Sequence, residues 1–447
     1  MQISLGAIAD RFPLERVRAI LARTGRGSRR NRQMPAQVTL YYVIAMTLLM
    51  EVSCREVLRC LLEGLRWFAP PGQTPIRITG KSGISQARSR LGSDPLKQLH
   101  DEVVRPIATE RTRGATYRRW KLVSIDGSTL DVADTDANEE EFGRPGASRG
   151  KSGFPQIRFV SLVENGTHVL FASCLGGVEA GEATLAEGVM GALTVGMLCL
   201  ADRNFFGYEA WKRATGTGAD LLWRVKKNLI LSCRQRLADG SYLSKIYPSP
   251  RHRERDQGGI TVRVIEYRLR GVPDAEPLYR LVTSILESEA APATELAALY
   301  HERWEIETAL DELKTHLRGR KMILRSKTPD LVRQEFYGLL LAHFAVRGLM
   351  HEAALKAHVD PDVLSFIHAV RVIRRKLPQF AAVSEKQRQI LHERVLEELL
   401  EERVASSRGR RNMRGVKQKV GKFPIRRRGA SISDTDSRCP PQVEIVM

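Results

Sequence analysis

The sequence lacks any hydrophobic stretch long enough to cross a membrane. Its longest apolar run, residues 38–50, holds 13 residues and includes two threonines, whereas a membrane-spanning helix needs about 20 apolar residues. The first residues show no basic segment followed by an apolar stretch, so we expect no signal peptide. These absences favour a cytoplasmic protein without a membrane partner.

Cysteine motifs and a nucleotide-binding loop are also missing. The six cysteines, at positions 54, 60, 174, 199, 233 and 439, form no C-x-x-C pair and no Cys/His cluster with zinc spacing. We interpret them as ordinary thiols of a reducing compartment. Gly80-Lys81-Ser82 resembles the end of a P-loop, but the first glycine of that motif would fall at Pro75. This excludes a P-loop nucleotide triphosphatase.

What the sequence does have is positive charge. Its 71 basic and 51 acidic residues give a formal charge of +20, and 43% of its 447 residues are hydrophobic. The length predicts two to four folded domains. The charge does not specify a fold, but it predicts a polyanionic partner such as DNA.

The first 118 residues are predicted to be mostly helical and strongly basic. They hold 20 Lys/Arg and 9 Asp/Glu, a net charge of +11, which is typical of a DNA-binding domain. A predicted helix at 82–91 carries Arg88 and Arg90 and could enter a DNA groove. The alternatives are a surface helix and, for the whole segment, a dimerisation or scaffolding domain.

The pattern then changes to that of an α/β domain. A short apolar strand at 122–125 ends at Asp126, and strands at 156–163 and 167–174 flank Asn165-Gly166, a strong hairpin signal. A helix at 182–193 and a buried strand at 195–201 follow, and this strand ends at Asp202. The order of strand, strand, strand, helix, strand predicts a ribonuclease-H-like core.

The rest of the chain completes the predicted layout. Short strands at 221–225, 229–233, 260–269 and 279–286 predict a β-rich insertion, and helices resume at residue 294. Residues 406–428 hold ten Lys/Arg and no Asp/Glu, which predicts a disordered tail that adds DNA affinity or has no defined role. We predict six parts: a helical DNA-binding domain (1–118), the first part of the core (119–219), a β-rich insertion (220–290), the second part of the core (291–330), C-terminal helices (331–404) and a disordered basic tail (405–447).

Asp126 and Asp202 are candidate metal ligands because each follows a short apolar strand. Strand ends in an α/β core converge on one edge, where ligand sites form. Mg²⁺ prefers oxygen ligands and usually takes one or two carboxylates from a protein. A single aspartate after a strand is usually structural, so neither residue identifies a site alone.

The segment YHERWEIETALDELK, residues 300–314, is more specific. Tyr300, Arg303, Glu307 and Lys314 would lie within about 60° of one another on an ideal α-helix. One helix face would then carry a carboxylate, two cations and a phenol. The alternative is an exposed helix edge with ordinary ion pairs between neighbouring turns.

This Y-x-x-R-x-x-x-E-x-x-x-x-x-x-K pattern resembles the signature of the DDE transposases of the fourth bacterial insertion-sequence family. The segments SIDGSTL at 124–130 and LADRNFFGYEAW at 200–211 resemble the blocks around that family's first and second aspartates. ISQARSRLGSDPL at 84–96 resembles its N-terminal domain, and GADLLWRVKKN at 218–228 resembles the start of its β-rich insertion. The similarity covers roughly residues 1–380 and leaves the basic tail out.

The resemblance implies a ribonuclease-H-like catalytic domain with two divalent metal ions, Mg²⁺ or Mn²⁺. It assigns the catalytic, metal-binding roles to Asp126, Asp202 and Glu307. Two ions about 4 Å apart activate an attacking oxygen and stabilise the departing one. The resemblance also implies that Arg303 and Lys314 hold DNA phosphates.

Other side chains near these blocks are further candidates. Tyr300 can donate a hydrogen bond to a phosphate, and Arg203 is a phosphate contact or the partner of a carboxylate. Trp304 and Trp223 can stack on a displaced base, although core packing is the simpler role for both.

The sequence therefore predicts a cut-and-paste transposase of an insertion sequence that cleaves and joins double-stranded DNA at terminal inverted repeats and target sites. We expect it to work at the bacterial nucleoid, as a homodimer or larger assembly on paired DNA ends. Two alternatives stay open: another metal-dependent ribonuclease-H-like nuclease, and a catalytically silent DNA-binding relative.

Overall fold

The computed structural model describes residues 11–28, 34–67, 79–147, 150–270, 276–317, 323–376, 385–404 and 442–446. The chain divides into two compact units. Unit 1 comprises residues 1–116, 127–189 and 306–404, and unit 2 comprises residues 117–126, 190–305 and 405–447. Strand β2 (Trp120–Asp131) and helix α11 (Trp304–Asp311) each run from one unit into the other.

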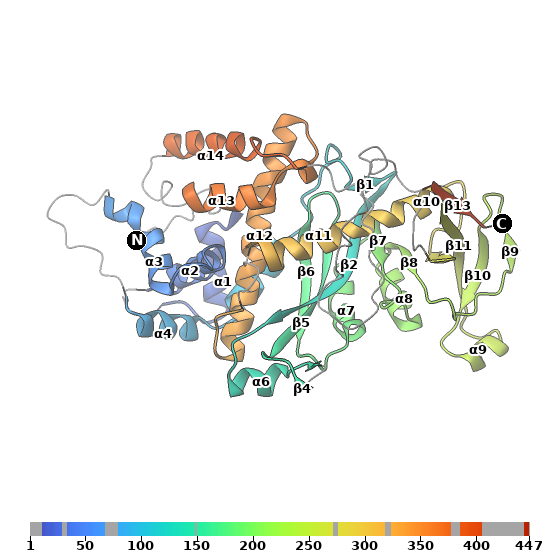
Figure 1. Ribbon diagram of the computed structural model, residues 1–447, viewed down its shortest axis with the longest axis horizontal. Coiled ribbons are helices and arrows are strands. Elements are labelled where there is room, and N and C mark those ends of the chain that lie inside the picture. Colours follow the sequence, from blue (N-terminus) through green and yellow to red (C-terminus); the bar gives the residue numbers. More distant parts are fainter. Residues whose placement is uncertain are drawn as a thin grey trace, which may run out of the picture. The chain divides into compact units, whose positions relative to one another are not determined.

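Unit 1 is mainly helical. Its long helix α12 (Pro329–Ala357) is buried along most of its length and packs against α2 (Ala36–Leu48) (Figure 1). Gly338 permits the close approach, because a Cβ there would lie 2.9 Å from Val43 Cγ1. The Thr47 hydroxyl donates to the Gly338 carbonyl at 3.1 Å. The other helices of this unit are α1 (Leu14–Arg23), α3 (Cys54–Trp67), α4 (Lys81–Leu91), α5 (Asp94–Val103), α6 (Asp136–Phe142), α13 (Phe366–Lys376), α14 (Glu385–Leu399) and most of α7 (Glu182–Met190).

A β-hairpin is the main sheet element that lies wholly in unit 1. β5 (Gln156–Glu164) pairs antiparallel with β6 (Val169–Gly176), and β5 neighbours β2 in the sheet. Gly166 occupies the turn at φ 80°, where an added Cβ would lie 2.8 Å from the Ala115 nitrogen. The predicted hairpin around Asn165-Gly166 is confirmed. A small second sheet pairs β3 (Gly146–Ala147) with β4 (Gly150–Lys151).

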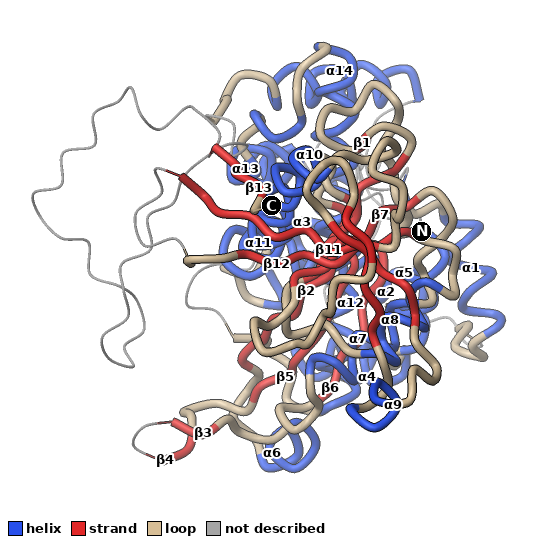
Figure 2. The backbone as a smooth tube through the Cα atoms, turned by 90° about the vertical axis from the view of Figure 1, so that its right-hand side faces the viewer, coloured by secondary structure: helices blue, strands red, loops and turns tan. Residues whose placement is uncertain are grey.

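Unit 2 is built on a mixed sheet, whose strands appear in red in Figure 2. The first part of β2 pairs parallel with β7 (Met197–Ala201), which pairs parallel with β8 (Asp220–Arg224). Antiparallel strands continue the sheet in the order β12 (Tyr279–Thr283), β11 (Ile260–Arg270), β10 (Tyr242–Ile246) and β9 (Gln235–Arg236). The helices of this unit include α8 (Tyr208–Thr215), α9 (Pro250–Glu254) and α10 (Ala293–Leu299).

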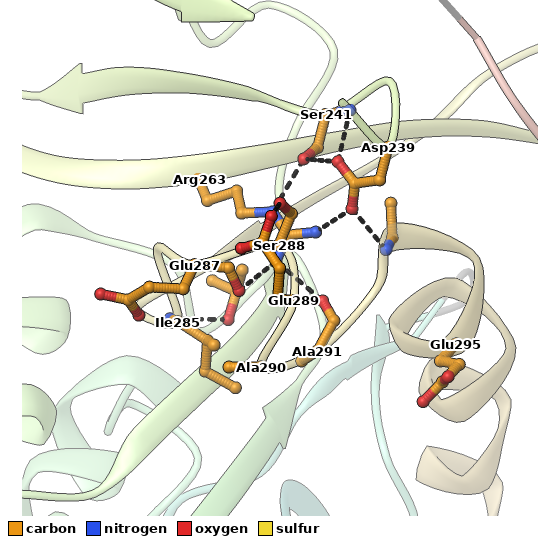
Figure 3. Close-up of polar contacts among 12 residues, drawn as sticks. Asp239, Ser241, Arg263, Ile285, Glu287, Ser288, Glu289, Ala290, Ala291 and Glu295 are labelled. Carbon is orange, nitrogen blue, oxygen red and sulfur yellow. Dashed lines mark hydrogen bonds and ion pairs between the residues drawn. The ribbon is translucent and has the colours of Figure 1, made fainter. Parts of the chain in front are cut away.

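A buried arginine joins the antiparallel strands of unit 2 to α10 (Figure 3). Arg263 on β11 is fully buried, and its guanidinium donates to Ser241 Oγ at 2.8 Å and to the Ala291 carbonyl at 2.8 Å. It also pairs with Asp239, whose carboxylate accepts the Ala293 N–H at 2.8 Å. This network fixes the start of α10, the helix that leads into the segment 300–314.

The five predicted elements occur in the predicted order as β2, β5, β6, α7 and β7, but α6, β3 and β4, which had not been predicted, lie between β2 and β5. Other expectations were wrong. Residues 229–233 form no strand, whereas β10 and α9 had not been predicted. Short polar-rich segments such as YLSKI give little period-2 signal of their own and depend on their partner strands.

The predicted disordered tail also needs a correction at its end. Residues 442–445 form strand β13, which pairs antiparallel with Tyr267–Arg270 of β11. The Arg270 guanidinium also bonds the Glu444 carboxylate. The basic segment 406–428 lies outside the described residues.

No helix in the described part of the chain combines the length and the apolar character that crossing a membrane requires.

Candidate active site

Asp126 and Asp202 lie on adjacent parallel strands of unit 2. Ile125 and Ala201 are the last register partners of β2 and β7, and each aspartate is the next residue along its strand. Neighbouring strands lie about 4.8 Å apart, so the two aspartates occupy neighbouring positions. The expected convergence is confirmed, with one correction: β2 does not end at Asp126 but continues to Asp131.

The segment that follows α10 contacts both strands. Arg303 Nη1 lies 3.4 Å from Asp126 Oδ2, and the Arg303 side chain is only 11% exposed. The Tyr300 hydroxyl donates to the Ala201 carbonyl at 3.1 Å. Burial raises the pKa of Tyr300, so its hydroxyl stays protonated and continues to donate. The segment 300–303 is thus attached to Asp126 on β2 and to Ala201, the residue that precedes Asp202, on β7.

These contacts bear on the roles considered for Tyr300 and Trp223. Tyr300 is buried, and its hydroxyl is directed to the backbone of β7 rather than outward. Trp223 is fully buried against Trp211, at 5.4 Å between ring centroids. Both observations favour structural roles. Trp304, in contrast, is 39% exposed.

Arg203 follows Asp202 and lies at the rim of an open hollow. Its backbone N–H donates to Asp202 Oδ1 at 2.7 Å, which orients that carboxylate. Its exposed guanidinium lies 3.5 Å from Glu276. The hollow has a volume of about 450 Å³ and is lined by Arg203, Lys226, Lys227, Asn228 and Glu276. The sequence pattern did not predict this hollow, although the basic residues at 224–227 indicated an anion-binding surface.

Glu307 and Lys314 belong to unit 1. Lys314 Nζ donates to Ser128 Oγ at 2.7 Å, on the part of β2 that lies in this unit. Glu307 lies on α11 and is half-buried. The assumption of an ideal α-helix from 300 to 314 was wrong. Residues 300–303 form a 3₁₀ turn, 304–311 an α-helix and 312–317 a π-helix, so the angular offsets differ from 100° per residue.

The π-helical turn is held by a buried group of charges that the sequence did not reveal. Glu312 accepts from Arg347 Nε at 2.8 Å and lies 3.3 Å from both His343 Nε2 and His168 Nδ1. Burial by itself raises the pKa of Glu312, but Arg347 above all outweighs it, and the pKa is held well below its usual value. Glu312 is therefore ionised, and it anchors the turn that carries Lys314. The available signal was the i, i+4 pair His343 and Arg347 within the otherwise apolar stretch 338–350 of α12.

The two arginines predicted on α4 differ in their surroundings. Arg88 is 7% exposed, and its guanidinium donates to Gln334 Oε1 and Ser326 Oγ, each at 2.8 Å. These contacts are those of an internal packing residue. Arg90 is exposed on the same helix and keeps its place as a DNA-contact candidate.

Asp126 and Asp202 could hold a divalent metal ion. They present carboxylate oxygens, the donors that Mg²⁺ and Mn²⁺ prefer, from neighbouring strands. Adjacent like charges repel each other, and Arg303 supplies part of the compensating positive charge at Asp126. The residues present therefore fit a site for a hard cation.

Two family models match this chain. The insertion element 4 transposase N-terminal domain matches residues 2–101, and the transposase DDE domain matches residues 121–345, slightly more than half of the chain. The chain belongs to the IS4 family of DDE transposases. This transposase is thus an enzyme that cleaves DNA, and its DDE domain implies dependence on a divalent metal. The prediction of a DNA transposase is confirmed.

Individual relatives agree with the family. The transposase is 28% identical to "Transposase InsG for insertion sequence element IS4" of Escherichia coli K12 over 386 residues, 83% of each chain. It is 21% identical to the "Putative transposase InsZ" of the same organism over 216 residues, 48% of this chain and 69% of that one. Among solved structures, a piggyBac transposase synaptic complex with hairpin DNA aligns with a TM-score of 0.43 and 12% identity, covering 88% and 84% of the two chains.

Proposed function

We propose that this transposase performs cut-and-paste transposition of an insertion sequence, with Asp126, Asp202 and Glu307 as its catalytic metal ligands. The observation that supports this best is the register of β2 and β7, in which each aspartate directly follows the last paired residue, together with the contact between Arg303 and Asp126. We assign the role of third acid to Glu307 from the signature at 300–314, in which it follows Arg303 by four residues. We propose that it completes the set of catalytic acids.

We further propose that β2, β5, β6, α7 and β7 form a ribonuclease-H-like core. In this proposal the antiparallel strands between residues 220 and 290 are an insertion, and the chain returns to the core with the segment 291–330. The parallel pairing of β2 with β7 supports the assignment. So does the break from parallel to antiparallel pairing between β8 and β12.

The three acids would hold two Mg²⁺ or Mn²⁺ ions. Bound there, such ions lower the pKa of an attacking water or 3′-hydroxyl and stabilise the departing oxygen. The protein's own part is positioning and charge. Arg203 N–H orients the Asp202 carboxylate, and the Tyr300 hydroxyl fixes the end of β7.

The cations around the acids would bind DNA phosphates. Arg303 and Lys314 are both half-buried and both attached to β2, to Asp126 and Ser128 respectively. Cations held this firmly lose little conformational freedom on binding a phosphate. Arg203 and Arg90 are exposed and would add contacts to double-stranded DNA whose strength falls with salt.

Two further parts of the proposal follow from the reaction. Pairing both ends of an element requires at least two active sites, so we propose a homodimer or larger assembly on DNA. Since the substrate is chromosomal DNA, we also propose that the enzyme acts at the nucleoid.

Strand cleavage in Mg²⁺ tests the site. Asp126→Asn, Asp202→Asn and Glu307→Gln should each lose about 4 kcal/mol of transition-state stabilisation, roughly a thousandfold in rate, while DNA binding persists. Asp131→Asn, further along β2, and Asp311→Asn, at the end of α11, are matched controls that should keep cleaving. Near-native cleavage by any one of the first three variants would remove that acid from the site.

A further inference from the structure

Glu276 holds several of the cations at the hollow beside Asp202. Its carboxylate lies 2.7 Å from Arg224 Nη2, 3.5 Å from Arg203 Nη1 and 3.7 Å from Lys227 Nζ. Arg224 and Lys227 lie three residues apart at the end of β8, and Arg203 follows β7, so a single carboxylate draws together cations from two segments of unit 2. Lys226 lines the same hollow, so the group comprises four cations and one acid and keeps a net charge of +3.

Tyr279 holds both Arg224 and the Glu276 backbone in position. The Arg224 guanidinium lies 4.8 Å from the centroid of the Tyr279 ring, which itself stacks on Tyr267 at 5.2 Å. The Glu276 backbone N–H donates to the Tyr279 hydroxyl at 3.2 Å. Arg224 is therefore oriented by the sheet and by Glu276 together.

The electrostatics show that the carboxylate is firmly ionised. Burial by itself raises the pKa of Glu276, but Arg224, then Arg203 and Lys227, outweigh it, and the pKa is lowered overall. Yet the Glu276 side chain is 32% exposed, and the Arg203 and Lys227 side chains are 45% and 59% exposed. Water and a competing anion can therefore reach the same cations.

A carboxylate and a phosphodiester make the same kind of contact with these groups. Both present anionic oxygens that accept from a guanidinium or an ammonium. We propose that Glu276 occupies, in the DNA-free protein, the place of a DNA phosphate at the Arg203–Arg224–Lys227 cluster, and that a DNA strand entering the hollow displaces it. The inference rests on the proposal that Arg203 contacts DNA.

In this proposal the Glu276 carboxylate competes with the phosphates of non-specific DNA for the same cations. Much of the affinity for any sequence comes from phosphate contacts. A cluster already partly neutralised by Glu276 yields less free energy on binding a phosphate, so DNA that makes no other contacts is disfavoured. A carboxylate that only braced the fold would have the opposite signature, because its removal would disorder the cations and weaken binding.

DNA-binding measurements test the proposal. Fluorescence anisotropy gives the affinity for a random-sequence duplex of about 20 base pairs over a series of salt concentrations, with EDTA present. Glu276→Gln should bind about five- to tenfold more tightly than Glu254→Gln, and its affinity should fall more steeply with salt by about one phosphate contact. Glu254 is an exposed acid on α9 in the same unit, so both variants lose the same formal charge. Equal or weaker binding by Glu276→Gln would overturn the proposal.

Two additions keep the result decisive. Glu276→Asp retains the charge but withdraws the carboxylate by one methylene, so it should bind more tightly than wild type and less tightly than Glu276→Gln. If Glu276→Gln fails to fold, an unchanged or lower affinity of Glu276→Asp contradicts the proposal by itself. Failure of the catalytic assignment would appear in the cleavage assays of the three acid variants and would leave this binding comparison unaffected.

Discussion

Glu312 in unit 1 and Glu276 in unit 2 each pair with a group of basic side chains, but water reaches only Glu276. The Glu312 side chain is 6% exposed and lies between Arg347, His343 and His168. The Glu276 side chain is 32% exposed at an open hollow. A buried pair that loses one partner leaves an uncompensated charge in the interior, whereas an exposed pair contributes little to stability. The ion pairs of Glu312 thus stabilise the fold, whereas another anion can replace Glu276 at its cations.

The largest effect should follow from breaking the buried group. Glu312→Gln leaves Arg347 buried without its counter-charge and should lower the free energy of unfolding by about 3–5 kcal/mol. Urea denaturation followed by circular dichroism measures this directly. Asp311→Asn, the neighbouring exposed acid, should change stability by less than about 1 kcal/mol. If the two variants were equally stable, the distinction between the buried and open groups would fail.

A smaller effect should separate the two arginines of α4. Arg88→Gln removes the guanidinium that donates to Gln334 and Ser326, and it should lower the free energy of unfolding by about 1–3 kcal/mol. Arg90→Gln should cost less than about 0.5 kcal/mol and should instead reduce the salt dependence of DNA binding by about one contact. A destabilised Arg90→Gln protein, or a stable Arg88→Gln protein with weakened DNA binding, would reverse the roles assigned here.

The smallest effect concerns pH. Burial lowers the pKa of His343, which stays neutral in the folded protein. In the unfolded chain the same ring takes up a proton below about pH 6.5. Unfolding therefore binds a proton, and stability should be complete above about pH 7.5 and decline as the pH falls from there to about 5.5. Burial lowers the pKa of His351 as well, which acts in the same direction.

Denaturation midpoints at three pH values within this range measure the decline. Glu312 should not contribute there, because its pKa is held below its ordinary value and its stabilising effect is lost only at more acidic pH. A stability that rose on acidification would contradict the neutral, buried state of His343.

Local patterns predicted the elements that carry the acids. The apolar runs before Asp126 and Asp202 predicted β2 and β7, and parallel pairing then placed the residues side by side. The family signature at 300–314 identified Arg303, which indeed contacts Asp126. These features depend on short stretches of sequence whose hydrophobic pattern or motif is visible without a partner.

The features that the sequence did not reveal depend on distant partners. Glu312 acquires its role from residues 168, 343 and 347, and Glu276 from residues 203, 224 and 227. The π-helical turn at 312–317 and strand β13 likewise depend on tertiary contacts that no local period encodes. Arg88 and Arg90 are two residues apart, and only the fold shows that one is internal and the other exposed.

The central claim is that Asp126, Asp202 and Glu307 form one metal site, and anomalous diffraction from a DNA-bound crystal containing Mn²⁺ tests it most directly. We predict two manganese peaks about 4 Å apart, contacted by carboxylate oxygens of all three residues. Peaks elsewhere, or a Glu307 carboxylate more than about 10 Å from both aspartates, would contradict the account.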